Sequence, residues 1–586
     1  MDKYEISKIF EEIGMMMELK GENPFKIRAY YNGARTVELM EEDIKVLVEE
    51  NRLNTIKGIG KALEGKIIEL VETGKLEFYD KLKEEIPEGV MEMLKIPGVG
   101  PKKIRELYDK LEITSIGELE YACLENRLVD LKGFGEKTQI KILEGIEQIK
   151  KYQGKFLIST GLKYGTYLVT QLKELPELSQ VSLAGSIRRR KEIIKDIDII
   201  VSCGKNDRDK VMDFFTTIEG VGKVIAKGDT KSSVVLNIGM NVDLRLVEEG
   251  EFAYALLHFT GSKEHNTLLR GRAKKMGLKV NEYGIFREEE RLPADTEEEL
   301  YGLLELDYIP PELREGQGEI EMAEKNQLPN LVEHKDVKGI FHVHSQYSDG
   351  RNTIEELVKA AIERGFRYIG ISDHSKSAAY AGGLREEDVK KQHREIEDLR
   401  EKYPQITILK GIESDILVDG SLDYEDEVLA SFDYVIGSIH SNFNLDEETM
   451  TNRILKAVQN KYTTILGHVT GRLLLSRKGY QLDIEEIIQA CADNHVAIEI
   501  NSNPHRLDLD WRLCRYAKEK GVKLVIEPDA HRIEGLDDVM YGVGIARKGW
   551  LESEDVINTM EIEEVLERFK KETQEQKEMK WENQKM

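Results

Sequence analysis

The spacing of hydrophobic positions changes along the chain. Residues 1–150 have the pattern of short helices joined by glycine-containing turns. Residues 181–247 instead contain apolar runs of strand length, VSLAGS, DIDIIVS, SSVVLNIG and NVDLRLV, and residues 250–320 return to mixed helix and turn. This order predicts a helical region followed by a domain built on a sheet.

The last part of the chain alternates between two patterns. After a polar, turn-rich stretch from Pro310 to Val337, apolar strand candidates alternate with helical segments. The candidates are GIFHVHS, YIGISDH, TILKGIES, YVIGSIH, TTILGHV, VAIEINS and KLVIEPDAH. Such alternation predicts parallel strands, either in a barrel or in a doubly wound sheet. Beyond Ile562 the pattern predicts a charged helix or a frayed tail.

Composition adds limits to this picture. A chain of 586 residues needs several cores, and 40% hydrophobic with 33% charged residues is typical of globular proteins. No apolar run approaches the roughly 20 residues that span a bilayer, so we expect no membrane partner. The start, MDKYEISKIFEEIG, is acidic and amphipathic and lacks the pattern of a signal peptide.

The cysteines and the net charge indicate the compartment and the partners of the protein only weakly. Cys123, Cys203, Cys491 and Cys514 form no CxxC pair, which argues against a disulfide framework and suits a reducing cytoplasm. The net charge of −25 argues against nucleic acid as a partner. Residues 151–200, however, carry nine Lys and Arg against five Asp and Glu, so local charge matters more than the total.

A short motif occurs three times in the helical region. IKGIGK begins at Ile56, IPGVGPK at Ile96 and LKGFGEK at Leu131, each followed by a helical pattern. These turns resemble helix-hairpin-helix motifs, in which backbone N–H groups at a helix N-terminus bind DNA phosphate without reading sequence. The glycines concerned are Gly58, Gly60, Gly98, Gly100, Gly133 and Gly135.

Histidines gather at the ends of the C-terminal strand candidates. Six of the 12 histidines lie there, accompanied by carboxylates: His342, His344, His374, His440, His468 and His531 with Asp349, Asp373, Glu413 and Asp529. Residues i and i+2 of a strand face one side, so the HxH and DxH pairs each direct two ligands to one point. A lone histidine is usually structural, but six at the ends of different strands favour a cluster of two or three Mn²⁺, Zn²⁺ or Fe²⁺ ions. Closely spaced metals suit phosphoryl chemistry.

A second candidate site follows Ala184. Asp196 and Asp198 lie on one face of a predicted strand, and Asp243 on another strand completes a carboxylate triad for Mg²⁺ or Mn²⁺. Gly185 and Ser186 form a strand-to-helix turn whose N–H groups suit a nucleotide phosphate, assisted by Arg189. A bare DxD is weak, but the GS turn before it and the third Asp make the nucleotidyltransferase pattern.

From residue 1 to about 318 the chain resembles the family X DNA polymerases. Support comes from the segment HFTGSKEHN, which begins at His258, where the family usually has Tyr. The resemblance implies that Phe259 and Gly261 line the sugar of the nucleotide, that Asn266 contacts its base, and that Arg270 meets the template.

The segment NPFKIRAY resembles the start of the family's gap-binding domain. This implies that Lys26 and Arg28 bind a 5′-phosphate and that Lys66 aligns with the Schiff-base lysine of members that remove deoxyribose phosphate. A second basic position of that motif is Ala62 here. The alternative for Lys66 is an exposed helix lysine.

The histidine motifs in their order resemble the PHP (polymerase and histidinol phosphatase) domain over about residues 337–575, with Pro528 as a local departure before Asp529. The resemblance implies nine metal ligands: His342, His344, Asp349, His374, Glu413, His440, His468, Asp529 and His531.

The expected fold is multidomain. It comprises an α-helical N-terminal region with helix-hairpin-helix motifs, an α+β nucleotidyltransferase palm, and a C-terminal α/β PHP barrel of seven strands, distorted from regular symmetry. The expected boundaries are 1–85 for gap binding, 86–153 for the helix-hairpin-helix subdomain, 154–247 for the palm, 248–318 for nucleotide selection, 319–336 for a linker and 337–575 for the PHP domain.

The resulting hypothesis is a cytoplasmic, monomeric DNA repair polymerase. It fills short gaps in gapped or nicked DNA with dNTPs, and its PHP domain acts as a 3′–5′ exonuclease, extending to abasic-site or 3′-end phosphodiester cleavage. One alternative keeps the polymerase and makes the PHP domain a phosphatase of small molecules or pyrophosphate. A second alternative is a DNA-binding scaffold without catalysis.

Overall fold

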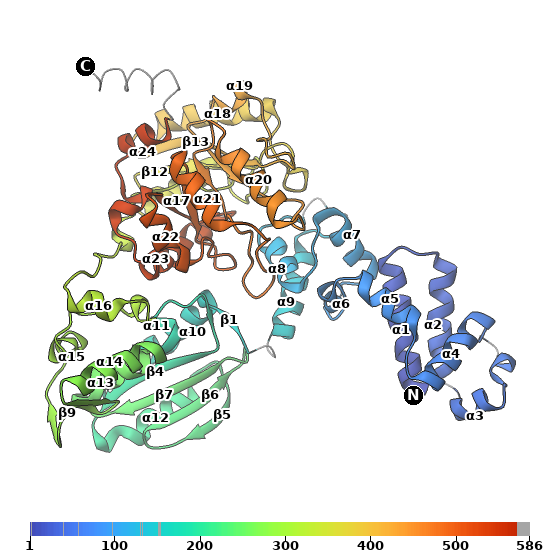
Figure 1. Cartoon of the computed structure of the whole chain (residues 1–586), viewed down its shortest axis with the longest axis horizontal. Coiled ribbons are helices and arrows are strands. Elements are labelled where there is room, and N and C mark those ends of the chain that lie inside the picture. Colours follow the sequence, from blue (N-terminus) through green and yellow to red (C-terminus); the bar gives the residue numbers. More distant parts are fainter. Residues whose placement is uncertain are drawn as a thin grey trace. The chain divides into compact units, whose positions relative to one another are not determined.

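A computed structural model gives the fold (Figure 1). It describes residues 1, 3–38, 40, 42–56, 58–96, 98–128, 131, 133–150 and 154–570. The last residues of the expected PHP domain, 571–575, and the rest of the tail lie outside this part. The chain divides into two compact units, Met1–Leu124 with Leu128–Ile149, and Glu125–Arg127 with Lys150–Met586.

The first unit is helical. Buried apolar side chains recur every three or four residues along its first helix, at Ile6, Phe10, Ile13 and Met17, and they form one core with the other helices of the unit. Its helices are α1 (Lys3–Leu19), α2 (Pro24–Glu38), α3 (Ile44–Glu49), α4 (Lys61–Thr73), α5 (Glu77–Glu85), α6 (Glu88–Met93), α7 (Pro101–Leu111), α8 (Ile116–Leu124) and α9 (Glu136–Lys150). The expected helical N-terminal region is confirmed.

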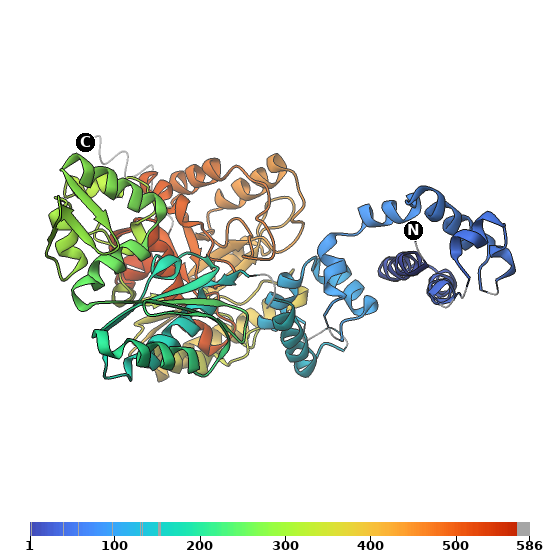
Figure 2. The same ribbon diagram turned by 90° about the horizontal axis from the view of Figure 1, so that it is seen from below.

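The second unit begins with a five-stranded mixed sheet of order β2-β4-β7-β6-β5. Its strands are β2 (Leu178–Leu183), β4 (Asp196–Cys203), β5 (Val221–Lys227), β6 (Lys231–Leu236) and β7 (Asn241–Val247). Helices α10 (Ile158–Lys173) and α12 (Arg208–Thr217) cover one face, as the views in Figures 1 and 2 show. β4 and β7 are parallel, whereas the other neighbours are antiparallel.

The predicted strands of this sheet are confirmed, and one strand was missed. β5 forms an edge and leaves most of its side chains exposed, so its sequence lacks the alternation of a half-buried strand. A short additional pair joins β1 (Phe156–Leu157) to β3 (Ile193–Ile194).

The segment that follows combines helices with a small antiparallel sheet of order β10-β9-β8. It contains α13 (Phe252–Thr260), α14 (Lys263–Lys275), β8 (Leu278–Asn281), β9 (Gly284–Arg287), β10 (Glu290–Leu292) and α15 (Glu297–Leu303). The stretch expected to be a linker, 319–336, is packed: it holds α16 (Glu319–Glu324), and Ile320 and Leu331 join the same core as Trp550. The stretch was predicted to be a linker because it is mostly polar and has few apolar residues that pack into the core.

Seven parallel strands follow in sequential order, β11-β12-β13-β14-β15-β16-β17. They are β11 (Gly339–Ile340), β12 (Tyr368–Ile371), β13 (Thr407–Asp415), β14 (Tyr434–Ser438), β15 (Ile465–Leu466), β16 (Ala497–Asn501) and β17 (Leu524–Glu527). A parallel bridge between Val343 and Ala530, with hydrogen bonds from His344 N to Ala530 O of 2.9 Å and from Ala530 N to His342 O of 3.2 Å, joins the first strand segment to the last. This bridge selects the barrel over the doubly wound sheet.

Helices surround the barrel: α17 (Ile354–Glu363), α18 (Glu386–Lys402), α19 (Asp426–Leu429), α20 (Glu447–Val458), α21 (Ile484–Asp493), α22 (Trp511–Glu519), α23 (Val539–Lys548) and α24 (Ile562–Phe569). Phe341, Tyr368, Leu409 and Tyr434 fill its interior, and Phe569 of α24 packs against them. With this end filled, the strand ends that carry the histidines form the other end.

Candidate active sites

Strand register brings the predicted carboxylates of the sheet together. In the parallel pair of β4 and β7, Asp198 lies opposite Asp243, and Asp196 lies opposite Asn241. Ile197 and Ile199 point into the core beneath the sheet, so the alternation of the strand places Asp196 and Asp198 on the other face. All three carboxylates therefore share one face.

The electrostatics of these carboxylates suit a divalent cation. Burial, together with the nearby charges of Asp196 and Asp243, raises the pKa of Asp198 to about 6. Burial also acts to raise the pKa of Asp243, but Lys231, 2.6 Å away, and the Ser233 hydroxyl, which donates at 2.5 Å, bring it below its usual value. Mutual repulsion of closely placed carboxylates is relieved when a cation binds between them.

Glycine at position 185 is required by the site itself. Gly185 has a φ of +61°, and a Cβ there would lie 2.1 Å from Oδ2 of Asp198. It opens α11 (Gly185–Arg188), a four-residue helix that carries the partly buried Ser186. The Ala184 N–H donates to the Asp198 carbonyl oxygen at 2.8 Å, which fixes the turn against β4. The role of Gly185 and Ser186 in nucleotide binding stays a prediction.

Arg189 is buried and holds a neighbouring loop. Its guanidinium donates to the carbonyl oxygen of Thr260 and pairs with Glu315 at 3.1 Å. Arg188 donates to the Thr260 hydroxyl at 2.7 Å and pairs with Glu297 at 2.6 Å. The loop after α13 is thus held by two arginines, and a direct contact of Arg189 with phosphate remains a prediction.

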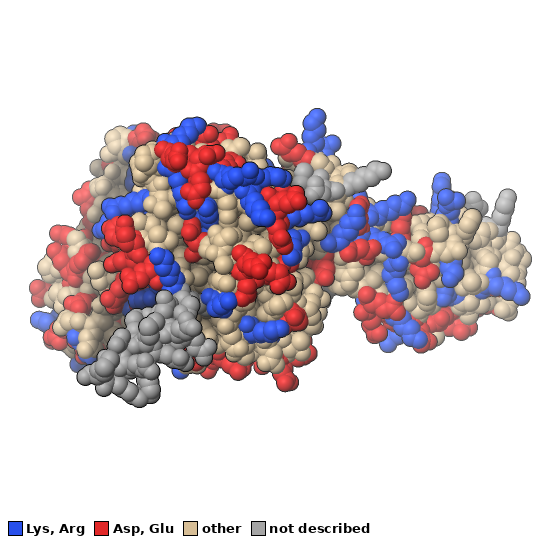
Figure 3. All heavy atoms as spheres, turned by 90° about the horizontal axis from the view of Figure 1, so that it is seen from above, with Lys and Arg blue, Asp and Glu red and all other residues tan. Residues whose placement is uncertain are grey.

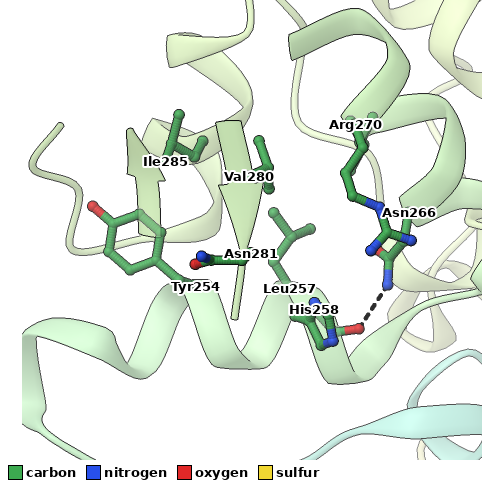
Figure 4. A pocket seen from close by; sticks show the side chains of 9 residues that line it. Tyr254, Leu257, His258, Asn266, Arg270, Val280, Asn281 and Ile285 are labelled. Carbon is green, nitrogen blue, oxygen red and sulfur yellow. Dashed lines mark hydrogen bonds between the residues drawn. The ribbon is translucent and has the colours of Figure 1, made fainter. Parts of the chain in front are cut away.

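A pocket lies between α13, α14 and the small sheet (Figure 4). His258, Asn266, Arg270 and Asn281 line it, and Asn266 Nδ2 donates to the His258 carbonyl oxygen at 2.7 Å. Burial lowers the pKa of the His258 imidazole, which keeps the ring neutral. The pocket joins the residues that the resemblance assigns to base and template contact.

Phe259 and Gly261 lie at the end of α13, beside this pocket in sequence. The Arg245 guanidinium stands 4.2 Å from the centre of the Phe259 ring. Gly261 has a φ of +68° and ends the helix. Their contact with a nucleotide sugar stays a prediction.

The three glycine turns of the first unit share one geometry. Gly58, Gly98 and Gly133 have φ of +108°, +82° and +90°, while Gly60 and Gly100 cap α4 and α7, and Gly135 precedes α9. The apolar residue between each pair of glycines is buried. Each turn therefore anchors one side chain in the core and leaves the first amides of a helix for an anion.

The predicted phosphate ligands of the first unit lie on its helices. Lys26 and Arg28 are exposed on α2. Lys66 on α4 is half-buried, with its ammonium 4.2 Å from the centre of the Phe78 ring, and burial lowers its pKa. A depressed pKa suits an amine nucleophile. The role of Lys66 stays a prediction beside the alternative of an exposed helix lysine.

The nine expected metal ligands of the barrel lie at the carboxyl ends of its strands. His342 and His344 follow β11, His374 follows β12, and Glu413 belongs to β13. His440, His468, Asp529 and His531 follow β14, β15 and β17, and Asp349 lies in the loop after β11. All nine side chains are buried or nearly so.

Their ligand atoms form overlapping groups. His344, Asp349, His374 and His531 offer atoms within 4.8 Å of one another, as do His342, His344 and Asp529, and likewise His374, Glu413 and His440. His344 and His374 each belong to two groups. His468 joins through its Nε2, 3.0 Å from Oε1 of Glu413.

Buried polar atoms in this cluster favour metal binding. Nε2 of His342, both ring nitrogens of His344, Oδ2 of Asp349 and Oε2 of Glu413 have no hydrogen-bond partner among the described residues. Buried polar atoms are normally paired, so several orphans that face one another fit a cation-binding cluster. Burial lowers the pKa of His344 to about 4 and of His468 to about 3, which leaves both imidazoles neutral, as ligation requires.

Sequence patterns missed the side chains that support these ligands. Glu499 contacts His342 Nδ1 at 2.6 Å, Asp415 contacts His440 Nδ1 at 2.6 Å, and the Asn501 amide donates to Asp529 at 3.0 Å. Carboxylates that hold the second nitrogen of a histidine are typical of metal centres. Glu499 lies in β16 and Asp415 in β13, and both strands end at the site. This position near the strand ends was the feature of the sequence that could have indicated their role.

Asp373 has a different role from the metal ligands around it. Its carboxylate accepts hydrogen bonds from the Ser345 amide at 2.8 Å, the Ser345 hydroxyl at 2.6 Å, the Ser348 hydroxyl at 2.5 Å and the Gln392 amide at 2.6 Å. It therefore fixes the loop that carries Asp349.

Comparison with known proteins covers most of the chain. Family models match residues 1–76 (helix-hairpin-helix domain), 90–148 (SAM-like helix-hairpin-helix tandem), 255–315 (DNA polymerase beta thumb) and 341–503 (PHP domain). The chain is 40% identical to the DNA polymerase/3′-5′ exonuclease PolX of Bacillus subtilis (strain 168) over 569 residues, which is 96% of this chain and 99% of that protein.

The chain belongs to the family X DNA polymerases. The chain is also 28% identical to a probable phosphatase of Thermoanaerobacter sp. (strain X514) over 247 residues, 39% of this chain and 93% of that protein. A probable phosphatase of Vibrio atlanticus (strain LGP32) is 29% identical over 221 residues, 35% of this chain and 83% of that protein. Among the described residues of this polymerase, no helix has the length and apolar character needed to cross a bilayer.

The pKa of Asp198 makes cation binding by the carboxylate triad dependent on pH. A metal binds the ionised carboxylate, so affinity falls as the pH drops below about 6. We expect the Mg²⁺ concentration for half-maximal nucleotide addition to rise on the order of tenfold between pH 7.5 and pH 5. Lys231→Gln should move this transition to higher pH, because Lys231 holds down the pKa values of Asp198 and Asp243.

Lys227→Gln serves as the matched control, since Lys227 pairs with Asp213 on α12. An equal Mg²⁺ requirement at both pH values, or the same shift in both lysine variants, would contradict the assignment.

Proposed function

We propose that this chain is a template-directed DNA repair polymerase that fills short gaps, with a 3′–5′ exonuclease in its PHP domain. The observations that carry the proposal are the buried histidine and carboxylate cluster of the PHP part and the three carboxylates Asp196, Asp198 and Asp243 that share one face of the sheet. The chain aligns end to end with a polymerase/exonuclease relative. The presence of all nine expected PHP ligands and all three expected carboxylates supports catalysis over a non-catalytic scaffold.

In the polymerase half, Asp196, Asp198 and Asp243 would hold Mg²⁺ or Mn²⁺. Such ions activate a 3′-hydroxyl and neutralise triphosphate charge. The protein's own contribution is to position the nucleotide between the Gly185–Ser186 turn and the pocket of Asn266. The raised pKa of Asp198 supports this role, because burial and the charges of Asp196 and Asp243 disfavour its ionised form until a cation binds.

In the PHP half, the nine ligands would hold two or three ions of Mn²⁺, Zn²⁺ or Fe²⁺, for which imidazole and carboxylate are suitable ligands. These ions would supply Lewis acidity for phosphodiester hydrolysis. The likeness to a probable phosphatase covers 39% of this chain, whereas the likeness to the polymerase/exonuclease relative covers 96% of it. Phosphodiester substrates, including abasic sites and blocked 3′ ends, therefore fit better than small phosphate esters or pyrophosphate.

The proposed substrate is gapped or nicked DNA, with dNTPs, bound by a monomer in the cytoplasm. The glycine turns would contact phosphates, and Lys26, Arg28 and Lys66 would receive the 5′ end of a gap. Acidic and basic side chains are interspersed on the face drawn in Figure 3, which suits local phosphate contacts in a chain of net charge −25. The four cysteines are free and buried, in keeping with a reducing compartment.

Asp196→Ala or Asp198→Ala should lower nucleotide addition below about a hundredth of wild type, since a lost metal position removes several kcal/mol of transition-state stabilisation. Exonuclease activity should survive, because the histidine cluster uses none of these residues. Primer extension and degradation assays on the same DNA measure both. Asp213→Ala, an exposed carboxylate on α12, is the control. Extension that persists in the Asp198 variant would refute the triad.

His344→Ala should eliminate DNA degradation and leave primer extension within about twofold, since His344 belongs to two of the ligand groups. Chelation should stop both reactions, and Mn²⁺ should restore degradation by the wild type better than Mg²⁺, because imidazole is a poor ligand for Mg²⁺. His495→Asn, an exposed histidine of the same domain, is the control. Degradation at the wild-type rate in the His344 variant would favour the phosphatase alternative.

Binding to gapped DNA should weaken strongly with salt and be independent of sequence, because the expected contacts are to phosphate. A 5′-phosphate at the gap should tighten binding, and Lys26→Ala with Arg28→Ala should abolish the difference between phosphorylated and unphosphorylated gaps. Titration by fluorescence anisotropy measures both affinities. Lys8→Ala with Lys75→Ala is the charge-matched control in the same unit. Equal affinity of the wild type for both gaps would contradict the role of Lys26 and Arg28.

A further inference from the structure

Lys548, the last residue of α23, is a fully buried lysine with an exposed fraction of 0%. Its ammonium contacts Glu315 Oε1 at 2.5 Å and donates to the carbonyl oxygens of Arg189 at 3.1 Å and Glu312 at 3.5 Å. It also stands 4.6 Å from the centre of the Trp511 ring. Fully buried lysines are rare and need such partners.

The partners of Lys548 belong to the other catalytic half of the same unit. Lys548 is part of the PHP domain, whereas Arg189, Glu312 and Glu315 belong to the polymerase. The neighbouring Arg547 repeats the arrangement, since it pairs with Glu312 at 2.8 Å. The C-terminal end of α23 is therefore docked on the segment that precedes α16 (Figure 1).

Glu315 connects Lys548 to Arg189 of the polymerase part. The same carboxylate oxygen that receives Lys548 also receives Arg189 Nε at 3.1 Å. Arg189 in turn donates to the carbonyl oxygen of Thr260, and a Cβ added at Gly261 would lie 3.2 Å from its Nη1. A continuous chain of polar contacts thus leads from the PHP helix to the loop Thr260–Ser262.

The same loop is bound on its other side. Arg314 accepts a hydrogen bond from the Ser262 amide at 3.0 Å through its carbonyl oxygen, and its guanidinium pairs with Glu297 at 2.6 Å. Glu297 also holds Arg188 at 2.6 Å. Glu315 follows Arg314 directly in the chain, so a shift of Glu315 displaces both supports of the loop at once.

Charge makes Lys548 important within this network. The side chain of Glu315 is 8% exposed, and that of Arg189 is 11% exposed. Buried charges interact strongly, and removal of one member leaves the others uncompensated. Without Lys548, the remaining ion-pair partners of Glu315 are Arg189 and Lys191. The Lys191 ammonium is 3.7 Å from the Glu315 carboxylate and is more exposed. The Glu315 carboxylate would then shift toward Arg189 and Lys191, and Arg189 would move away from the Thr260 carbonyl oxygen.

We propose that Lys548 of the PHP domain is a positioning residue for nucleotide addition, acting through Glu315 and Arg189 on the loop Thr260–Ser262. The proposal rests on the proposed function in one respect, namely that this loop lines the nucleotide site. It makes the PHP domain a structural part of the polymerase centre, in addition to its own hydrolytic role.

Lys548→Met in the full chain tests the proposal, because methionine fills similar space without the charge. We expect the KM for the incoming dNTP to rise on the order of tenfold, as for a displaced positioning group. The kcat of addition, the affinity for gapped DNA and the exonuclease rate should stay within about threefold of wild type. Lys548→Arg, which keeps a charge at this position, should give an intermediate KM.

Lys518→Met is the matched control. Lys518 is also an ion-paired lysine of the PHP domain, 2.8 Å from Glu552 and 2.7 Å from Asp555. Its loss should leave the KM for dNTP unchanged. The path is tested with Glu315→Gln, in whose background Lys548→Met should raise the KM no further, because the two residues act in series.

A wild-type KM in Lys548→Met, or an equal rise in Lys518→Met, overturns the proposal. A parallel fall of exonuclease and polymerase rates in Lys548→Met also overturns it, since that result describes general destabilisation. A further rise in the double variant overturns the route through Glu315. Failure of the proposed function looks different: nucleotide addition would then survive Asp198→Ala, whatever Lys548 does.

Discussion

Desolvation of grouped carboxylates and imidazoles is the constraint on which both candidate metal sites depend. Asp198 shares one face of the sheet with Asp196 and Asp243, and burial raises its pKa to about 6. In the barrel, Asp349, Glu413 and Asp529 are buried among six imidazoles whose ring nitrogens in part lack partners. The backbone contributes to this concentration, because His468 and Asp529 have φ of +20° and +49°. Such arrangements cost free energy without cations, and that cost is recovered on metal binding.

Parallel strands solve the problem of assembling these groups from distant parts of the sequence. In the five-stranded sheet, the parallel pair β4 and β7 sets Asp198 beside Asp243 by register alone. In the barrel, seven parallel strands bring their carboxyl ends to one rim, so a histidine after one strand meets a carboxylate after another. The filled opposite end, closed by Phe569 of α24, gives that rim a rigid base.

Local periodicity explains what the sequence could predict. Two motifs, the DxD that begins at Asp196 and the HxH that begins at His342, predict side chains on one face of a strand from only three residues. The βα alternation predicts the barrel strands. Groups defined only by packing could not be found in this way. The edge strand β5 lacks a buried face, β8 to β10 have only three or four residues, and Glu499 supports His342 from 157 positions away. The packed stretch 319–336 was expected to be a linker because its anchors are few.

Helix α23 links the two halves in a way that apolar packing alone would not. It follows His531 in sequence, and ten residues of helix extend about 15 Å to Lys548. Close packing on the barrel is set by Gly542, where a Cβ would lie 2.0 Å from the Ser502 hydroxyl oxygen. Its far end is fixed by ion pairs to Glu312 and Glu315. Apolar contacts tolerate sliding, whereas buried ion pairs are directional and fail when displaced. A helix packed on the barrel at Gly542 and ion-paired through Arg547 and Lys548 therefore ties the PHP part of this unit to the segment of Glu312 and Glu315.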